Sequence, residues 1–115
     1  KGRQGMRDML ALLRQGGVIL VLMDQHMTTG APLPFLGRPA LTATAIPAMC
    51  KRSGAVLLPA SAIRSDDGTR FDIRFEAPIT AADGIEMTAA VNRRIEAWVA
   101  DRPAQWFWLH RRWRQ

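Results

Sequence analysis

The feature that most constrains the fold is an unbroken apolar run at residues 18–23, which follows the glycine pair Gly16-Gly17. The run holds valine, isoleucine, leucine and one methionine, and it is far too short to cross a bilayer. A short run that is apolar at every position is typical of a strand in a parallel sheet, because helices cover both faces of such sheets. The sequence therefore predicts an α/β fold with a mostly parallel sheet flanked by helices.

Asp24 and Gln25 follow directly after this predicted strand. In open α/β sheets, ligands bind outside the carboxyl ends of the strands, where the next loop begins. These two residues are therefore the first candidates for a functional site. The alternative is a strand end followed by an ordinary polar turn.

Three amphipathic or apolar stretches predict helices. They cover residues 5–15, about 44–53 and 87–99, with Gly16, Gly54 and Pro103 as the respective stop signals. The single cysteine, Cys50, lies in the second stretch, so we expect a buried thiol and no internal disulfide.

The remaining segments predict strands and loops. An apolar strand at residues 55–63 is interrupted by Pro59, and residues 65–69 predict a hairpin turn. Residues 70–75 alternate between polar and apolar side chains and predict a half-buried antiparallel strand. Residues 26–39 contain three prolines and two glycines, which predicts a loop without regular structure that crosses the sheet.

The net charge and the motifs limit the kinds of ligand and cofactor that the sequence predicts. The net charge is +6, mostly from arginine, which favours phosphate or carboxylate partners, although a solvated basic surface is equally compatible. The chain contains neither a P-loop nor a GxGxxG motif. His26 and His110 have no second ligand at helical or turn spacing, so we predict no metal site and no cofactor.

The segment at residues 103–114 has an unusual composition, with three tryptophans, one phenylalanine, one histidine and three arginines. Aromatic rings beside arginines suit a bilayer interface. They also suit single-stranded nucleic acid, which they bind by stacking and backbone charge. The third possibility is that Trp106 and Trp108 pack into the core while the arginines are solvated.

Several segments together carry a resemblance to a known family. They are Asp24-Gln25, Phe35-Leu36-Gly37-Arg38-Pro39-Ala40, residues 51–59 (KRSGAVLLP) and residues 103–113 (PAQWFWLHRRW). In this order and spacing they resemble the lipid A biosynthesis lauroyl and myristoyl acyltransferases of the lysophospholipid acyltransferase superfamily. The resemblance runs along the whole chain and implies the C-terminal part of a glycerolipid-acyltransferase-like fold.

The resemblance also implies an activity. Such enzymes move a fatty acyl group from acyl carrier protein, or acyl-CoA, to a hydroxyl of a lipid A precursor at the cytoplasmic face of the bacterial inner membrane. Their catalytic signature is a histidine followed five positions later by an acid, and this chain departs from it, since Ala31 follows His26 and Gln115 follows His110 at that distance. We therefore expect residues 1–115 to be the C-terminal portion of one acyltransferase domain. The histidine motif would lie upstream, and this portion would be inactive alone.

The resemblance assigns candidate roles to eight residues. Asp24 and Gln25 would support the missing general base, and the predicted substrate contacts are Lys51, Arg64, Arg111, Arg112, Phe35 and Leu36. For each arginine, a solvated or salt-bridged structural role is the alternative. Two other functions stay open at this point: a small basic nucleic-acid-binding module, and an acyltransferase for another glycolipid such as a phosphatidylinositol mannoside.

Overall fold

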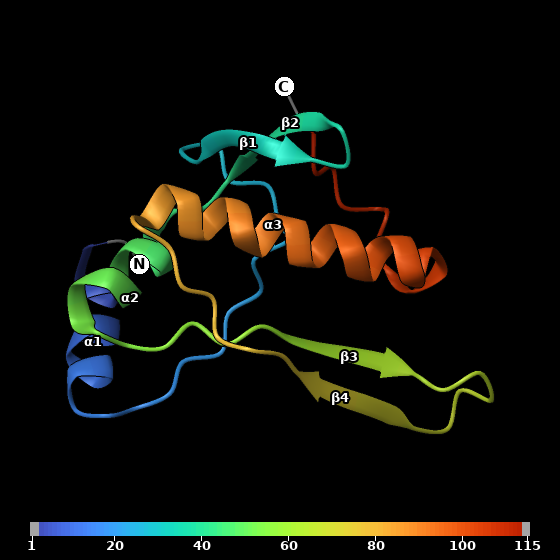
Figure 1. Ribbon diagram of the computed structural model, residues 1–115, viewed down its shortest axis with the longest axis horizontal. Helices are drawn as coiled ribbons and strands as arrows, with labels where there is room; N and C mark the ends of the chain where they lie inside the picture. Colours follow the sequence, from blue (N-terminus) through green and yellow to red (C-terminus); the bar gives the residue numbers. More distant parts are fainter. Residues whose placement is uncertain (1–2, 114–115) are drawn as a thin grey trace.

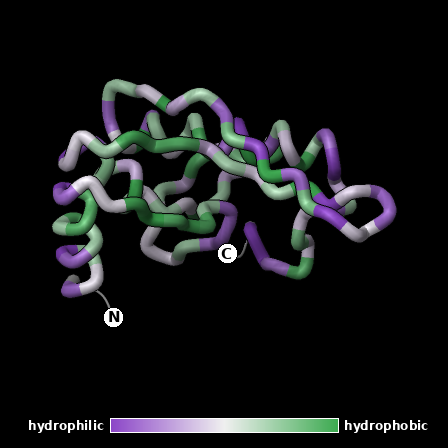
Figure 2. The backbone as a smooth tube through the Cα atoms, turned by 90° about the horizontal axis from the view of Figure 1, so that it is seen from below, coloured by the Kyte–Doolittle hydropathy of each residue, from purple (hydrophilic) through white to green (hydrophobic). Residues whose placement is uncertain are grey.

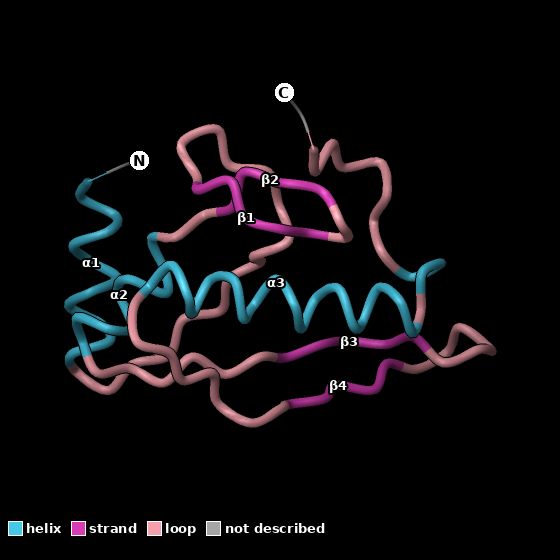
Figure 3. The backbone as a smooth tube through the Cα atoms, turned by 45° about the horizontal axis from the view of Figure 1, so that its top comes forward, coloured by secondary structure: helices cyan, strands magenta, loops and turns pink. Residues whose placement is uncertain are grey.

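The computed structural model describes residues 3–113 and arranges them around one long helix. The elements in chain order are α1 (Arg3–Arg14), β1 (Ala31–Phe35), β2 (Arg38–Thr42), α2 (Ala45–Ser53), β3 (Ala60–Arg64), β4 (Phe71–Phe75), α3 (Gly84–Asp101) and the 3-10 turn η1 (Pro103–Gln105). Helix α3 lies between the hairpin β1–β2 on one side and the hairpin β3–β4 on the other, and α1 and α2 lie together at one end (Figures 1 and 3).

Helix α3 confirms the predicted C-terminal helix and begins three residues earlier than the apolar pattern indicated. Its start is fixed by Asp83, whose carboxylate accepts a hydrogen bond from the Glu86 backbone N–H at 2.8 Å. The Glu86 side chain in turn accepts from the Ala82 N–H at 2.9 Å, so two otherwise unpaired backbone donors are satisfied.

The core forms where α3 meets the first hairpin. Phe35 and Ala40 from that hairpin pack against Val91, Ile95 and Val99 on one face of α3. Phe35 is completely buried, and burial of a side chain of this size contributes about 1.5–3 kcal/mol. This cluster fixes the position of α3 relative to β1 and β2.

The two predicted N-terminal helices are confirmed as α1 and α2. Helix α2 ends at Gly54, which has a left-handed backbone (φ +76°) and donates its N–H to the Cys50 carbonyl. Cys50 is buried as expected, and loss of solvation raises the pKa of its thiol.

The predicted mostly parallel sheet is wrong for the described residues. Between residues 3 and 113 the strands form two separate two-stranded antiparallel sheets, β1–β2 and β3–β4. Residues 18–23 form no strand, because they find no pairing partner in this part of the chain. The fold remains mixed α/β, and the predicted antiparallel hairpin exists as β3–β4.

The prediction of an irregular loop at residues 26–39 is also wrong, because most of its second half belongs to the hairpin β1–β2. In this hairpin Phe35 pairs with Arg38, so every second residue from that pair turns its N–H toward the partner strand. Pro32, Pro34 and Pro39 all occupy the alternate positions, whose nitrogen faces away from the ladder. A two-stranded sheet therefore accommodates these prolines without losing a hydrogen bond.

The hairpin β3–β4 confirms the predicted turn at residues 65–69 and corrects two details. Strand β3 begins at Ala60, after Pro59, and not at residue 55. Strand β4 is exposed at all five positions and is not half-buried. Its apolar side chains Phe71, Ile73 and Phe75 are 55–68% exposed, because no layer covers this face within the described residues.

Candidate functional site

Hydrogen bonds join residues 24–27 to β2 and to the C-terminal segment, residues 106–113. We call this set of contacts the clasp. Trp106 donates its indole N–H to the Asp24 Oδ2 at 3.1 Å. Two residues later, the His26 backbone N–H donates to His110 Nε2 at 2.6 Å, and the Met27 N–H donates to the Leu41 carbonyl at 3.1 Å. The turn that follows residues 18–23 is therefore fixed by segments distant in sequence.

Arg112 anchors this clasp and is completely buried. Its guanidinium donates to the Leu41 carbonyl at 2.8 Å and to the Thr42 hydroxyl at 2.7 Å, and it lies over the Phe35 ring at 4.8 Å. Burial lowers the pKa of Arg112, and the charge of Asp24 acts in the opposite direction. The opposite charges of Asp24 and Arg112 therefore stabilise each other across the clasp.

Asn92 connects the clasp to the middle of α3. Its amide donates to the Pro34 carbonyl at 2.9 Å and to the Thr42 hydroxyl at 3.3 Å, while its oxygen lies 3.5 Å from the Arg112 guanidinium. A buried polar network of this kind is stabilising only when its members have partners. Asn92 is thus a buried polar residue of α3 that contacts both β2 and the C-terminal segment.

Asp24 also lies at the wall of a large cavity, which has a volume of about 860 Å³. The wall is mainly apolar and is contributed by residues 16–24, residues 53–58, strand β3 and the facing side of α3. Trp106 also lines the cavity, so the hydrogen-bonded pair Trp106–Asp24 forms a polar site in its mainly apolar wall. A cavity of this size and composition suits a hydrophobic ligand whose polar end meets Asp24.

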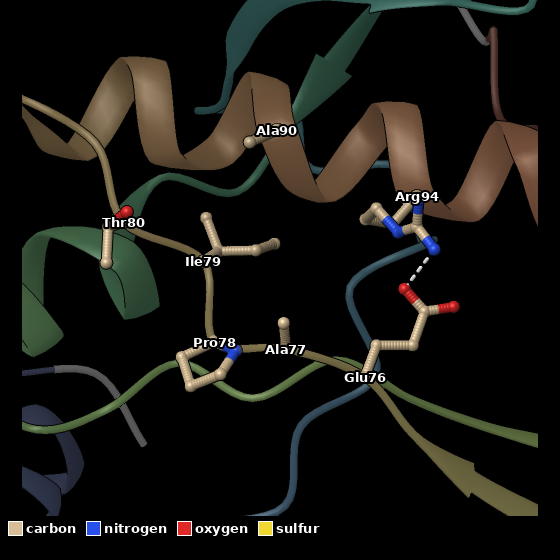
Figure 4. A pocket seen from close by; sticks show the side chains of 7 residues that line it. All are labelled: Glu76, Ala77, Pro78, Ile79, Thr80, Ala90 and Arg94. Carbon is tan, nitrogen blue, oxygen red and sulfur yellow. Dashed lines mark ion pairs between the residues drawn. The ribbon is translucent and has the colours of Figure 1, made fainter.

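A second, shallower hollow of about 480 Å³ lies between residues 76–80 and α3 (Figure 4). Its two charged residues, Glu76 and Arg94, form an ion pair across it. Glu76 also accepts the Trp98 indole N–H at 2.7 Å. These contacts join α3 to the end of β4, so the ion pair of Glu76 and Arg94 has a structural role.

The other predicted polar site residues are dispersed. Gln25 is exposed beside Asp24. Lys51 is exposed on α2 and donates to the Ala81 carbonyl at 2.8 Å. Arg64 is exposed on β3, where it lies over the Phe71 ring at 4.5 Å, and Arg111 is exposed in the C-terminal segment. Of the predicted basic residues, Arg112 is the buried one, and it interacts with Asp24 through its charge.

The predicted apolar contacts Phe35 and Leu36 do not line the large cavity. Phe35 belongs to the core, where it contacts Trp106 and Trp113 with ring centroids 5.6 and 5.7 Å apart. Leu36 is in the β1–β2 turn with a left-handed backbone (φ +48°), and its N–H donates to the Glu96 carboxylate. That hydrogen bond offsets part of the strain of a left-handed leucine.

Sequence reasoning missed several members of the clasp, namely Trp106 as an Asp24 partner, His110, Asn92 and Thr42. One signal was present, because Asn92 interrupts the apolar stripe Met87, Val91, Ile95 with a polar side chain. A polar residue within such a stripe indicates a buried hydrogen bond. The partners of Asn92 lie 20 to 58 residues away and have no local signal.

Within residues 3–113, no three histidine, cysteine or acidic side chains lie close enough together to hold a metal ion. The helices in this part of the chain are also too short or too polar to span a membrane.

Comparison with known proteins identifies the family. The family model described as bacterial lipid A biosynthesis acyltransferase matches residues 1–115. The chain belongs to this family. A relative is the lipid A biosynthesis lauroyltransferase of Escherichia coli (strain K12), which is 29% identical over 119 residues. That alignment covers 97% of this chain and 39% of the relative, so the chain spans about two-fifths of the relative's length.

Proposed function

We propose that this chain is the C-terminal portion of a membrane-associated acyltransferase. The complete enzyme would move a fatty acyl group from acyl carrier protein, or acyl-CoA, to a hydroxyl of a lipid A precursor. The observation that carries the proposal is the family match along all 115 residues. The lauroyltransferase relative supports acyl transfer, and the apolar cavity beside Asp24 supports a hydrophobic ligand.

The chemistry assigns Asp24 a supporting role. The acceptor hydroxyl attacks the thioester carbonyl carbon, its proton passes to a general base, and the carbon–sulfur bond breaks as the thiol takes up a proton. The base would be the histidine of the family's motif, in the portion of the enzyme outside these residues. The hydrogen bond from Trp106 fixes the Asp24 Oδ2. The other carboxylate oxygen of Asp24 therefore points in a defined direction, in which it would orient the histidine.

We place the complete enzyme at the cytoplasmic face of the bacterial inner membrane. The support in this chain is a turn that exposes three consecutive apolar residues, Phe107, Trp108 and Leu109, which are 65%, 52% and 84% exposed. The exposed Arg111 lies two residues further along the chain. Aromatic side chains beside a cation suit the interface of an anionic bilayer.

The structure weakens the nucleic-acid alternative. Trp106 and Trp113 are partly buried and pack against Phe35, and Arg112 is completely buried, so these three residues are less accessible for stacking or for phosphate contact than the composition suggested. We therefore expect no nucleic-acid partner. The family match favours a lipid A acceptor over a phosphatidylinositol mannoside.

The first test is an assay of the complete enzyme with a lipid A precursor and with acyl carrier protein or CoA thioesters. We expect an acylated product by mass spectrometry. Failure with every acyl donor, by a folded enzyme, would contradict the proposed function.

The second test is Asp24→Asn in the complete enzyme, with Asp72→Asn on the exposed face of β4 as the matched control. Loss of the orienting charge should lower kcat by roughly 100-fold while the Trp106 hydrogen bond and the fold are retained. The control should keep the parent rate. A normal kcat for Asp24→Asn, with unchanged near-ultraviolet circular dichroism, would remove Asp24 from the site.

A further inference from the structure

His110 accepts a hydrogen bond that fixes its protonation state. Its Nε2 accepts the His26 backbone N–H at 2.6 Å, across 84 positions of the chain. A backbone N–H only donates, so this ring nitrogen must carry a lone pair and the imidazole must be neutral. A protonated imidazole has an N–H at both nitrogens and cannot accept. The contact therefore exists with neutral His110 and is lost when the ring takes up a proton.

The histidine lies in an anchored stretch of the chain and not in a solvated tail. Seen from below, in Figure 2, the chain changes from hydrophobic to hydrophilic shortly before its C-terminal end. In this hydrophilic part His110 is half-buried and Arg112 is completely buried. Arg112 donates to the Leu41 carbonyl at 2.8 Å, and the same carbonyl accepts the Met27 N–H at 3.1 Å. The C-terminal segment is thus anchored on β2 two residues after His110.

The bond to His110 is the main-chain attachment of the turn that carries Asp24. Trp106 fixes the Asp24 carboxylate at 3.1 Å, and His110 fixes the backbone two residues later, at His26. Within residues 3–113, no other hydrogen bond joins the main chain of residues 24–26 to another segment. Loss of the His110 bond therefore leaves the Asp24 carboxylate bonded to Trp106 on a less constrained backbone.

Several charged or titratable groups belong to the segments that meet at the clasp. They are Asp24 and His26 in the turn, Arg38 on β2, Glu96 on α3, and Arg111 and Arg112 beside His110. The two acids favour a proton on the ring and the arginines oppose it. In either case a proton on Nε2 removes the acceptor, so the lone pair decides whether the contact exists.

We propose that neutral His110 is a positioning residue for Asp24, and that protonation of His110 releases the turn and slows acyl transfer. His110 acts through the His26 backbone and not on the substrate. The inference rests on the proposed function in one respect, namely the role of Asp24 in orienting the general base.

The first test replaces His110 in the complete enzyme. His110→Phe keeps a ring and removes the acceptor, and we expect it to lower kcat by roughly 10-fold. His110→Gln is the matched variant, because its carboxamide oxygen can accept the His26 N–H, and it should keep about half of the parent kcat or more. A normal kcat for His110→Phe would overturn the inference. So would a His110→Gln rate as low as that of His110→Phe.

A double variant tests whether the effect passes through Asp24. His110→Phe combined with Asp24→Asn should be no slower than Asp24→Asn alone, because residues that act as a unit have non-additive effects. A further loss of roughly 10-fold in the double variant would mean that His110 acts independently of Asp24. The positioning role would then be wrong.

The pH dependence separates positioning from packing. Glutamine does not titrate, so the ratio of kcat for His110→Gln to kcat for the parent cancels the titration of His26 and of the general base, which both enzymes keep. At higher pH both enzymes hold the turn. As the pH falls the parent alone loses the contact, so the ratio should rise by roughly 3-fold or more between about pH 8 and about pH 5.5. A ratio independent of pH would contradict the proposal, even if His110→Phe fails to fold.

Hydrogen exchange of the tryptophan indoles gives a readout without acyl transfer. The Trp106 indole N–H donates to Asp24, so it should exchange roughly 10-fold faster in His110→Phe than in the parent, by ¹⁵N-edited NMR of the complete enzyme. The Trp113 indole, which donates to the Phe35 carbonyl, is the internal control and should exchange as in the parent. Unchanged exchange at Trp106 would refute the inference. Faster exchange at Trp106 in an enzyme that transfers no acyl group would support the link between His110 and Asp24 and refute the proposed function.

Discussion

At the scale of residues, Arg112 is a charged side chain in a completely buried position. A basic residue in an arginine-rich segment was predicted to contact substrate, yet its guanidinium is buried against Phe35 and donates to β2. Its neighbour Arg111 is exposed. The two arginines therefore form a natural matched pair for testing structural against surface roles.

Arg112→Ala should lower the free energy of unfolding by about 3 kcal/mol or more, because the buried acceptors of β2 lose their donor and a cavity remains. Arg111→Ala should change the same quantity by less than about 0.5 kcal/mol. Urea denaturation followed by tryptophan fluorescence measures both. If Arg112→Ala prevents folding, Arg112→Lys, which keeps one charge but not the planar fork, should give a smaller measurable loss. Equal effects at the two positions would contradict the buried-anchor role.

At the scale of elements, α3 is the helix on which both hairpins depend. One face packs on the core residues from β1 and β2, and the ion pair of Arg94 with Glu76 joins α3 to the end of β4. The start of the helix is held by Asp83 and Glu86, which satisfy backbone donors reciprocally. Loss of this N-terminal cap should therefore destabilise α3, the helix that contacts both hairpins.

Asp83→Ala should lower the free energy of unfolding by about 1 kcal/mol, since the Glu86 N–H loses its acceptor. Asp83→Asn keeps a side-chain oxygen at this position and is the control, with an expected change of a few tenths of a kcal/mol. Thermal denaturation by circular dichroism compares the two variants. A loss of the same size in both would indicate that charge, and not the cap hydrogen bond, is responsible.

At the scale of the whole molecule, the apolar stripe of α3 is only partly covered. Val91, Ile95 and Val99 pack against Phe35 and Ala40 of the first hairpin, and they also line the apolar cavity that opens toward β3. We therefore expect residues 1–115, produced alone, to bind the dye 8-anilinonaphthalene-1-sulfonate strongly by fluorescence. The complete enzyme should bind much less, because its additional chain covers this side. Equal dye binding per molecule would contradict the expectation that the rest of the complete enzyme covers this apolar surface.

The sequence by itself determined the features that depend on local order along the chain. Helical periodicity and stop signals located α1, α2 and α3, the polar residues 65–69 located the β3–β4 turn, and the combined motifs indicated the acyltransferase family. Each of these features depends on residues a few positions apart, or on the order of motifs along the chain.

Only the tertiary structure decided which distant segments meet. The prolines of residues 32–39 predicted a loop and not a strand. In a two-stranded hairpin their nitrogens face the outer edges, so no ladder hydrogen bond is lost. The apolar run at residues 18–23 argued for a buried strand, but a strand requires a neighbour, and residues 3–113 provide none. Burial of Arg112 under β2 and its electrostatic interaction with Asp24 likewise depend on contacts across about 70 positions or more, which no local pattern encodes.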